Sequence, residues 1–360
     1  MRVLKLVLFW IIQLIVALGM LEVICHVFLK TSSNPLYRAR RILQQNESWG
    51  WQARPNLDTE FENAPVFTDL NGFRVENSAE SVDLQKVELL TLGPSSAFGW
   101  GVKAEETYTS KIAKALQLKY LNASQIGFST EQGLLLWNLF FKEKLPNLKY
   151  VIISYGINDL DRFRFYGLSF TDDISYFADG LNRPRDLSLN SSLLTTFNLF
   201  ENEALLNLNC TALSSMKQRL SLSESKQESL RLIKNLKEKN VKIIFVGTPY
   251  LKMPVNNEFQ YSDVNTYYEK SQTAATGGHC REALSLLKEA KALEPWRVEQ
   301  DVVKLAEAQK QLCDEEGILC IDAYTAFDRL KAQKEYFVDP VHPSQKGHDL
   351  IARLVLEKLN

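Results

Sequence analysis

Short apolar runs alternate with amphipathic stretches from about residue 86 to the end of the chain. The runs are rich in Val, Ile and Leu and lie within VELLTL, LKYLNAS, KYVIIS, VKIIFVG and GILCI. Because they lack the alternation of a half-exposed strand, they predict a parallel sheet that is covered on both faces. The amphipathic stretches between them predict the covering helices. The pattern therefore predicts an α/β domain over residues 86–360.

Two insertions interrupt this alternation of predicted strands and helices. Residues 161–222 are rich in Asn, Ser, Asp and aromatic residues with weak periodicity, and we interpret them as a candidate lid. Residues 263–316 carry two helical patterns, one from Glu282 to Leu293 and one from Val298 to Cys313, which resemble a single tetratricopeptide-type hairpin. One such unit cannot bury its own apolar face, so we expect it to pack on the main domain or on a protein partner.

The first 30 residues are apolar over a length suited to a membrane. An apolar run from Leu6 to Leu29 has only four interruptions, and about 20 apolar residues suffice to cross a bilayer. The pattern predicts an N-terminal transmembrane anchor over residues 1–30, with a cleaved signal peptide as the alternative. We expect a single-pass protein whose domain after the anchor is extracytoplasmic, although the basic residues after the run do not favour export.

Residues 31–85 are interpreted as a juxtamembrane segment with an edge hairpin. Short extended-looking segments occur around Phe61 to Phe67 and end in the turn Asn71-Gly72-Phe73-Arg74.

Charge and cysteine content limit the partners, metal sites and disulfides that we expect. The chain has 42 Lys and Arg against 43 Asp and Glu and no basic stripe, so nucleic acid is not an expected partner. No spacing of His and Cys indicates a metal site. Cys280, Cys313 and Cys320 lie around one helical segment; they are interpreted as buried thiols, with pairing in an oxidising compartment as the alternative.

Ser95 is the candidate nucleophile. It lies in LLTLGPSSAFGWGV, in a glycine-rich turn directly after a buried strand and ahead of a helix that begins near Glu105. A serine there needs a base to take its proton. Of the four histidines, His26 lies in the apolar run, His279 in the helical insertion and His348 in the final amphipathic helix. His342 remains as the candidate base.

Asp339 is the candidate partner of His342. In Asp339-Pro340-Val341-His342-Pro343 the prolines disfavour a helix, and we place Pro343 at the first turn of the last helix. A rigid loop of this kind lets Asp339 reach the far ring nitrogen and fix the tautomer. The alternative is that Asp339 caps the helix and His342 is an ordinary loop residue.

An acyl-transfer site also needs donors for an oxyanion. The backbone N–H groups of Ser95 and Gly127 and the side-chain amide of Asn158 all follow predicted strands. Each residue alone is more often a turn residue, so the prediction depends on their order and placement. Because ligands bind at the carboxyl ends of parallel strands, we expect these groups to meet at one edge of the sheet.

The order GPSSAFGWGV, NASQIGFSTEQ, YGINDL and DPVHPSQKGH resembles the four consensus blocks of the SGNH (GDSL-type) hydrolases. The resemblance spans Val87 to Asn360, with an insertion between the third and fourth blocks. The motif Asn71-Gly72-Phe73-Arg74 resembles one that precedes the catalytic domain in membrane-anchored bacterial members.

The resemblance implies a flavodoxin-like three-layer α/β/α fold and no cofactor. At the positions that match the family motifs, the resemblance implies that Ser95 is the nucleophile and that His342 is the base. It also implies that Asp339 orients His342 and that Gly127 and Asn158, with the Ser95 N–H, are the oxyanion donors.

The same resemblance implies ester hydrolysis, including hydrolysis of acetyl groups on sugars. We expect an esterase that hydrolyses or transfers a small acyl group, acetyl foremost, on an extracytoplasmic carbohydrate through an acyl-serine. Pro94 stands where the family usually has Asp, which favours the alternative of an inactive domain that acts as a binding or assembly subunit. A third hypothesis is a lipid esterase or lysophospholipase, which an apolar tunnel beside Ser95 would favour.

Overall fold

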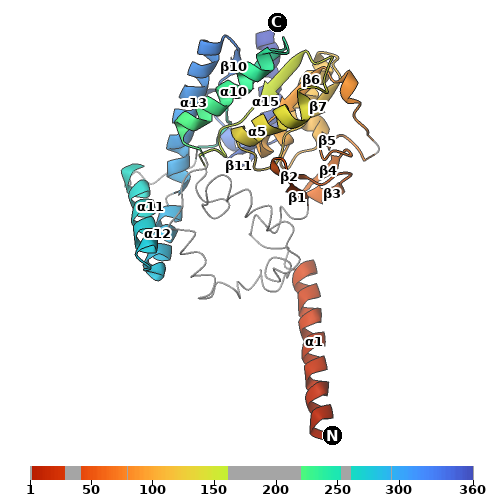
Figure 1. Ribbon diagram of the computed structural model, residues 1–360, viewed down its shortest axis with the longest axis vertical. Coiled ribbons are helices and arrows are strands. Elements are labelled where there is room, and N and C mark those ends of the chain that lie inside the picture. Colours follow the sequence, from red (N-terminus) through yellow and green to blue (C-terminus); the bar gives the residue numbers. More distant parts are fainter. Residues whose placement is uncertain are drawn as a thin grey trace.

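The computed structural model describes residues 2–28, 42–78, 80–160, 220–252, 261–292 and 294–359 (Figure 1). Residues 161–219 of the predicted lid at 161–222 lie outside the described residues. Searched over the described residues, the structure contains no helix long and apolar enough to cross a membrane.

An eight-stranded, mostly parallel sheet forms the centre of the molecule, in the order β10-β9-β8-β6-β7-β5-β4-β3. The five apolar runs form its parallel strands, as predicted: β6 (Leu89–Leu92), β7 (Tyr120–Asn122), β8 (Tyr150–Ile153), β9 (Lys242–Val246) and β10 (Leu319–Ile321). Read in chain order, these five have the flavodoxin-like order 2-1-3-4-5. The switch in direction falls between β6 and β8, where the first and third sequence blocks follow their strands.

Alternate residues of each parallel strand pack on opposite faces of the sheet. Leu90 and Leu92 of β6 belong to one buried cluster, whereas Leu89 belongs to the other. Because successive side chains of a strand point to opposite faces, an unbroken apolar run is what two helical layers require. The three-layer α/β/α arrangement is therefore explained by the composition of the strands.

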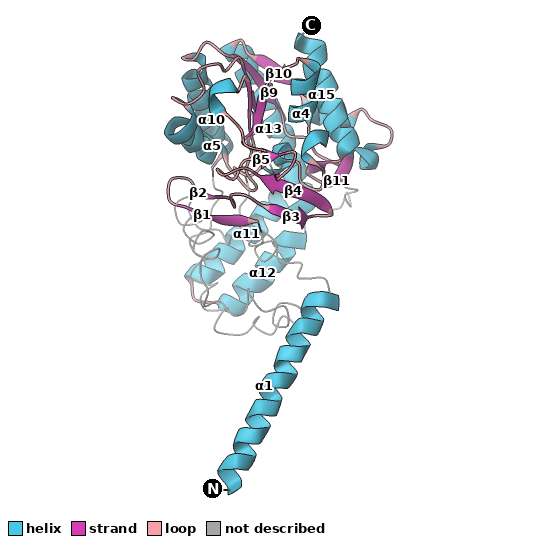
Figure 2. Cartoon of the chain, turned by 90° about the vertical axis from the view of Figure 1, so that its right-hand side faces the viewer, coloured by secondary structure: helices cyan, strands magenta, loops and turns pink. Residues whose placement is uncertain are grey.

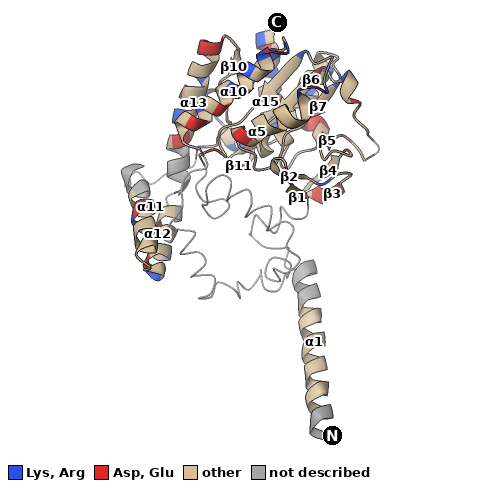
Figure 3. Ribbon diagram, in the orientation of Figure 1, with Lys and Arg blue, Asp and Glu red and all other residues tan. Residues whose placement is uncertain are grey.

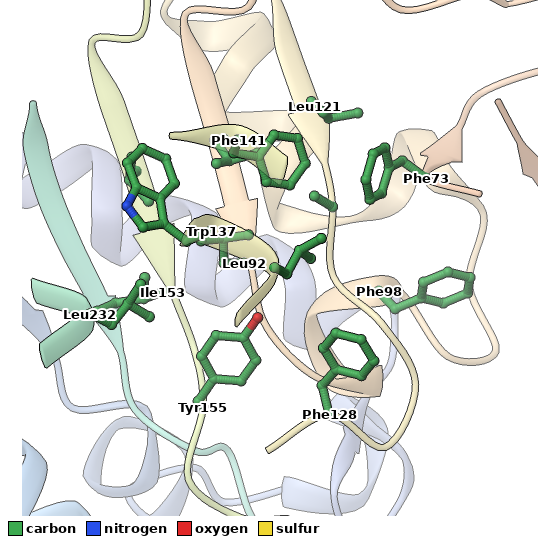
Figure 4. Close-up of a cluster of buried hydrophobic side chains, with 14 of the residues drawn as sticks. Phe73, Leu92, Phe98, Leu121, Phe128, Trp137, Phe141, Ile153, Tyr155 and Leu232 are labelled. Carbon is green, nitrogen blue, oxygen red and sulfur yellow. The ribbon is translucent and has the colours of Figure 1, made fainter. Parts of the chain in front are cut away.

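Different helices cover the two faces of the sheet, and each group packs on one of the two buried clusters. One side carries α5 (Thr130–Leu136), a π-helical turn (Trp137–Phe141) and α10 (Leu222–Lys237), with the aromatic core of Figure 4 beneath them. The other side carries α4 (Tyr108–Ala115), α14 (Ala323–Asp328) and α15 (Gln345–Leu359). Figure 2 shows the two layers on either side of the strands.

The segment ahead of β6 is part of the domain. The predicted edge hairpin forms as β3 (Asp58–Phe61) and β4 (Ala64–Thr68), and β5 (Arg74–Val75) joins it to the main sheet by pairing antiparallel with β7. A second hairpin, β1 (Leu43–Asn46) with β2 (Gly50–Ala53), was not predicted.

Three helices occupy the region predicted as a two-helix insertion: α11 (Tyr261–Thr276), α12 (Cys280–Ala292) and α13 (Glu294–Glu316). The close pair is α11 with α12, where the Ser271 hydroxyl donates to the Ala283 carbonyl at 2.6 Å. The end of α13 is held on α10 by exposed ion pairs, Lys226–Glu315 at 3.1 Å and Lys237–Glu316 at 2.7 Å. Figure 3 shows that α10 and α13 carry both positive and negative side chains. The predicted pairing of the 282–293 and 298–313 helices thus differs from the structure.

The cysteines near this region differ in state. Cys280 is disulfide-bonded, which contradicts its interpretation as a buried thiol, whereas Cys313 and Cys320 are free. Cys313 is buried in the core beside α10, as the interpretation of buried thiols expects.

Candidate active site

Ser95 begins a short helix at the carboxyl end of β6. This helix, α3 (Ser95–Phe98), follows Gly93 and Pro94, and the Pro94 carbonyl accepts from the N–H groups of Ala97 and Phe98 at 3.0 and 2.9 Å. The N–H groups of a first helical turn have no partner within the helix. Ser95 therefore presents both its hydroxyl and its N–H at the end of the strand, with 4% of its surface exposed.

His342 and Asp339 belong to a tight hairpin of β11 (Phe337–Asp339) and β12 (His342–Pro343). Asp339 Oδ1 accepts from the N–H groups of Val341 and His342, both at 3.0 Å. Asp339 therefore forms the turn and does not cap α15, which was the alternative. The placement of Pro343 in the first turn of the last helix is wrong, since Pro343 lies in β12 and α15 begins at Gln345.

The structure brings Ser95, His342 and Asp339 together. His342 Nε2 lies 2.7 Å from Ser95 Oγ, and His342 Nδ1 lies 2.6 Å from Asp339 Oδ2. Burial alone would raise the pKa of Asp339, but the hydrogen bonds from the His342 ring and from the Val341 and His342 N–H groups outweigh it and hold that pKa below its ordinary value.

The protonation state of the imidazole follows from that carboxylate. An ionised Asp339 only accepts hydrogen bonds, so His342 Nδ1 carries the proton. In the neutral ring Nε2 is then an acceptor and takes the hydrogen bond of the Ser95 hydroxyl. This tautomer is assigned from the hydrogen-bond network, and it is the one in which His342 can act as a base toward Ser95.

The predicted oxyanion donors lie at neighbouring strand ends. Beyond the strands, the Ser154 N–H donates to Leu92 O at 3.0 Å and the Gln125 N–H to Gly93 O at 2.9 Å, so the loops after β6, β7 and β8 stay joined. Gly127 adopts φ +77°, which favours glycine. Asn158 is 2% exposed, and its Nδ2 donates to Phe128 O at 2.9 Å. The Asn158 amide therefore lies against the loop that contains Gly127.

Asp159 anchors this loop and was not singled out from the sequence. It is fully buried, and its carboxylate accepts from the Thr130 N–H at 2.7 Å, the Thr130 hydroxyl at 2.6 Å and the Ser225 hydroxyl at 2.5 Å. These bonds tie the residue after Asn158 to the starts of α5 and α10. An acidic residue directly after a predicted oxyanion donor was the available signal.

The β1–β2 hairpin supports the Gly127 loop from outside the sheet. Trp51 Nε1 donates to Ile126 O at 2.7 Å, and the Ala53 N–H donates to Gln125 Oε1 at 2.7 Å. Gln125 Nε2 in turn donates to Gly72 O at 3.2 Å. The stretch interpreted as juxtamembrane thus supports the loop that contains Gly127.

A second histidine lies buried behind the site. His348 is on α15, as predicted, and its Nδ1 accepts from the Tyr108 N–H at the start of α4, at 3.2 Å. Burial foremost, with the positive charges of Lys111 and Arg74, lowers the pKa of His348 from 6.5 to about 3. His348 is therefore neutral, which its role as an acceptor requires.

The low pKa of His348 predicts a loss of stability in acid. Because the unfolded chain takes up this proton below about pH 6.5 and the folded chain only near pH 3, the free energy of unfolding falls with pH between those values, by at most about 1.4 kcal/mol per pH unit. His348→Asn, which keeps an acceptor for the Tyr108 N–H, should flatten this slope in urea titrations at pH 7, 5.5 and 4.5. His279→Asn, at an exposed histidine, should leave it unchanged. Parallel curves for the native chain and His348→Asn would contradict the assignment.

Within the described ranges, no group of three or more His, Cys, Asp or Glu side chains is placed to hold a metal ion.

Comparison with known proteins adds a family match. The model of the GDSL-like lipase/acylhydrolase family matches residues 91–350. A search of curated proteins finds no match. Among solved structures, the chain is similar to a lipase/acylhydrolase from Enterococcus faecalis, with 13% identity, 76% of this chain and 95% of that chain covered, and a TM-score of 0.42. It is also similar to Axe2, an acetylxylan esterase from Geobacillus stearothermophilus, with 15% identity, 77% and 96% covered, and a TM-score of 0.40.

Proposed function

Because the chain belongs to the GDSL-like lipase/acylhydrolase family, we propose that it is a serine esterase that hydrolyses or transfers a small acyl group through an acyl-serine at Ser95. The observation that carries the proposal is the continuous line of hydrogen bonds from Asp339 through His342 to Ser95, at 2.6 and 2.7 Å. Nucleophile, base and orienter within such reach are what serine catalysis requires.

In the proposed reaction Ser95 Oγ attacks the ester carbonyl carbon while His342 Nε2 takes the hydroxyl proton. The carbonyl oxygen becomes an oxyanion, which the N–H groups of Ser95 and Gly127 and the Asn158 amide stabilise. The C–O bond then breaks, and His342 gives its proton to the departing alcohol. Water, or a sugar hydroxyl in a transferase, attacks the acyl-serine by the same steps and regenerates Ser95.

The proposed substrate is an acetylated carbohydrate outside the cytoplasm. The choice of acetyl and of carbohydrate rests on the resemblance to the SGNH hydrolases, which is an argument by analogy. The disulfide of Cys280 supports an extracytoplasmic location, because disulfides persist in oxidising compartments.

The alternative of an inactive binding subunit rests on Pro94, and the local structure gives it little support. Side chains from other parts of the chain hold the turn that follows Pro94. Asn122 Nδ2 donates to Ala97 O at 2.9 Å, and the Arg74 guanidinium donates to Gly99 O at 3.3 Å. An aspartate before Ser95 is therefore not needed to fix the nucleophile.

Labelling with a fluorophosphonate tests the proposal. We expect one equivalent to react with the folded chain and the adduct to map to Ser95 by peptide mass spectrometry, because only a serine with a base in place reacts readily. Ser95→Ala and His342→Ala should both lose labelling while they keep the native circular dichroism spectrum.

The outcomes separate the hypotheses. Absence of labelling in a folded native chain would contradict the esterase and favour the binding subunit. If labelling occurs, hydrolysis of an acetylated oligosaccharide supports the proposed substrate, whereas turnover of lysophospholipid alone would favour the lipid esterase.

A further inference from the structure

Trp100 lies flat against His342. The two rings are stacked with centroids 4.6 Å apart and planes 9° from parallel. Asp339 and Ser95 bind the two ring nitrogens, but bonds at those two atoms leave the imidazole free to swing about the line that joins them. A flat contact on one face removes this freedom.

The Trp100 ring is itself held in place. Phe61, at the end of β3, meets it edge to face with centroids 4.8 Å apart and planes 82° apart. Phe61 is 6% exposed, so the contact is fixed by the core of the edge hairpin. Trp100 is therefore held between the β3–β4 hairpin and the β11–β12 hairpin, which lie far apart in the sequence.

The backbone around Trp100 is held by Arg74. Arg74 is 2% exposed, and its guanidinium donates to Val102 O at 2.8 Å and to Gly99 O at 3.3 Å, one on each side of Trp100. A third bond reaches Pro65 O in β4 at 2.9 Å. Burial lowers the pKa of Arg74 to about 10, so the guanidinium remains charged at neutral pH. Charge-assisted hydrogen bonds of this kind are stronger than neutral ones.

We propose that Trp100 is a positioning residue for His342: its ring holds the imidazole in the plane that joins Asp339 to Ser95, and Arg74 fixes the loop that carries it. The inference rests on the proposed function for its effect on turnover, whereas the stack itself can be observed without turnover. It also gives a role to Arg74, the last residue of the Asn71–Arg74 motif. Since Trp100 acts through the base, its loss should lower kcat and leave KM nearly unchanged.

The test compares full-length Trp100→Leu, Trp100→Phe and Phe140→Leu with the native chain. Phe140 is a matched control because it is also a partly buried aromatic residue, on the turn after α5. The stack is followed by the ¹Hε1–¹³Cε1 cross-peak of His342, one of four histidines, assigned with His342→Gln. Turnover is measured on a small aryl acetate.

We expect Trp100→Leu to move the His342 cross-peak downfield, as the ring current of the indole is lost. It should also lower kcat by about 10- to 100-fold, the size of effect that misplacing a catalytic group produces, with KM within about three-fold. Trp100→Phe should restore kcat to within about five-fold of native, and Phe140→Leu should change neither quantity.

Other results would overturn the inference. An unmoved cross-peak in Trp100→Leu would exclude the stack, and a moved cross-peak with unchanged kcat would exclude its catalytic role. A rise in KM alone would make Trp100 a substrate-binding residue instead. Absence of turnover and labelling in the native chain would contradict the proposed function. Failure of the stack is a separate outcome, because the position of the His342 cross-peak reports it without turnover.

Discussion

Asp339→Asn is expected to lower kcat for ester hydrolysis by about 10⁴-fold, the size of effect that the same change has in serine proteases. The Asn Oδ1 can still accept from the Val341 and His342 N–H groups, so the β11–β12 turn should persist. The amide that replaces Oδ2, however, donates to His342 Nδ1 instead of accepting from it. Nε2 then carries the ring proton and cannot accept the proton of Ser95. Steady-state kinetics on an aryl acetate measures the loss.

The control for this change is Asp322→Asn. Asp322 caps α14 by accepting from the Thr325 N–H at 3.0 Å, a bond that asparagine also makes. We expect this variant to keep native kcat, and both variants to keep nearly native free energies of unfolding. A fall of less than ten-fold in Asp339→Asn would show that His342 does not depend on Asp339 for its tautomer.

The parallel core was predictable because its signal is local. Each strand from β6 to β10 is a short apolar run, and burial on both faces follows directly from the lack of alternation. The His342–Asp339 pair was predictable for the same reason, since a four-residue turn that contains Pro340 and is followed by Pro343 places both side chains. His342 was also the only histidine left once the surroundings of the other three were considered.

The β1–β2 hairpin was not predictable in this way. Its strands read LQQN and GWQA, which are four residues each and lack the Val, Ile and Leu runs of the core strands. What orders them is contact with residues more than 70 positions away, such as the bond from Trp51 Nε1 to Ile126 O. A single sequence contains no local sign of that partner.

The contacts around Trp100 were hidden for a similar reason. The GWG that follows the nucleophile was visible, but the ring contacts Phe61 and His342, which lie on separate hairpins. The motif ending in Arg74 was recognised only by resemblance. Its physical role becomes clear only when the guanidinium is seen among the carbonyl groups of the Trp100 loop.

Gly72→Ala is expected to lower the free energy of unfolding by more than about 3 kcal/mol, because it combines backbone strain with a steric clash. Gly72 has φ +80°, and a Cβ there would lie 2.1 Å from Ala53 O, a backbone atom that cannot rotate away. The clash would push β2 from the turn and weaken the hold of the β1–β2 hairpin on the Gly127 loop. Activity should therefore fall together with stability.

Gly317→Ala separates the two causes. Gly317 also has a positive φ, +60°, but a Cβ there meets nothing within 4 Å, so only the strain of about 1 kcal/mol applies. Urea denaturation of both variants gives the comparison. Equal losses would mean that the contact with Ala53 contributes nothing. A larger loss in Gly72→Ala, accompanied by reduced fluorophosphonate labelling of the remaining folded protein, would show that the segment ahead of β6 supports the Gly127 loop.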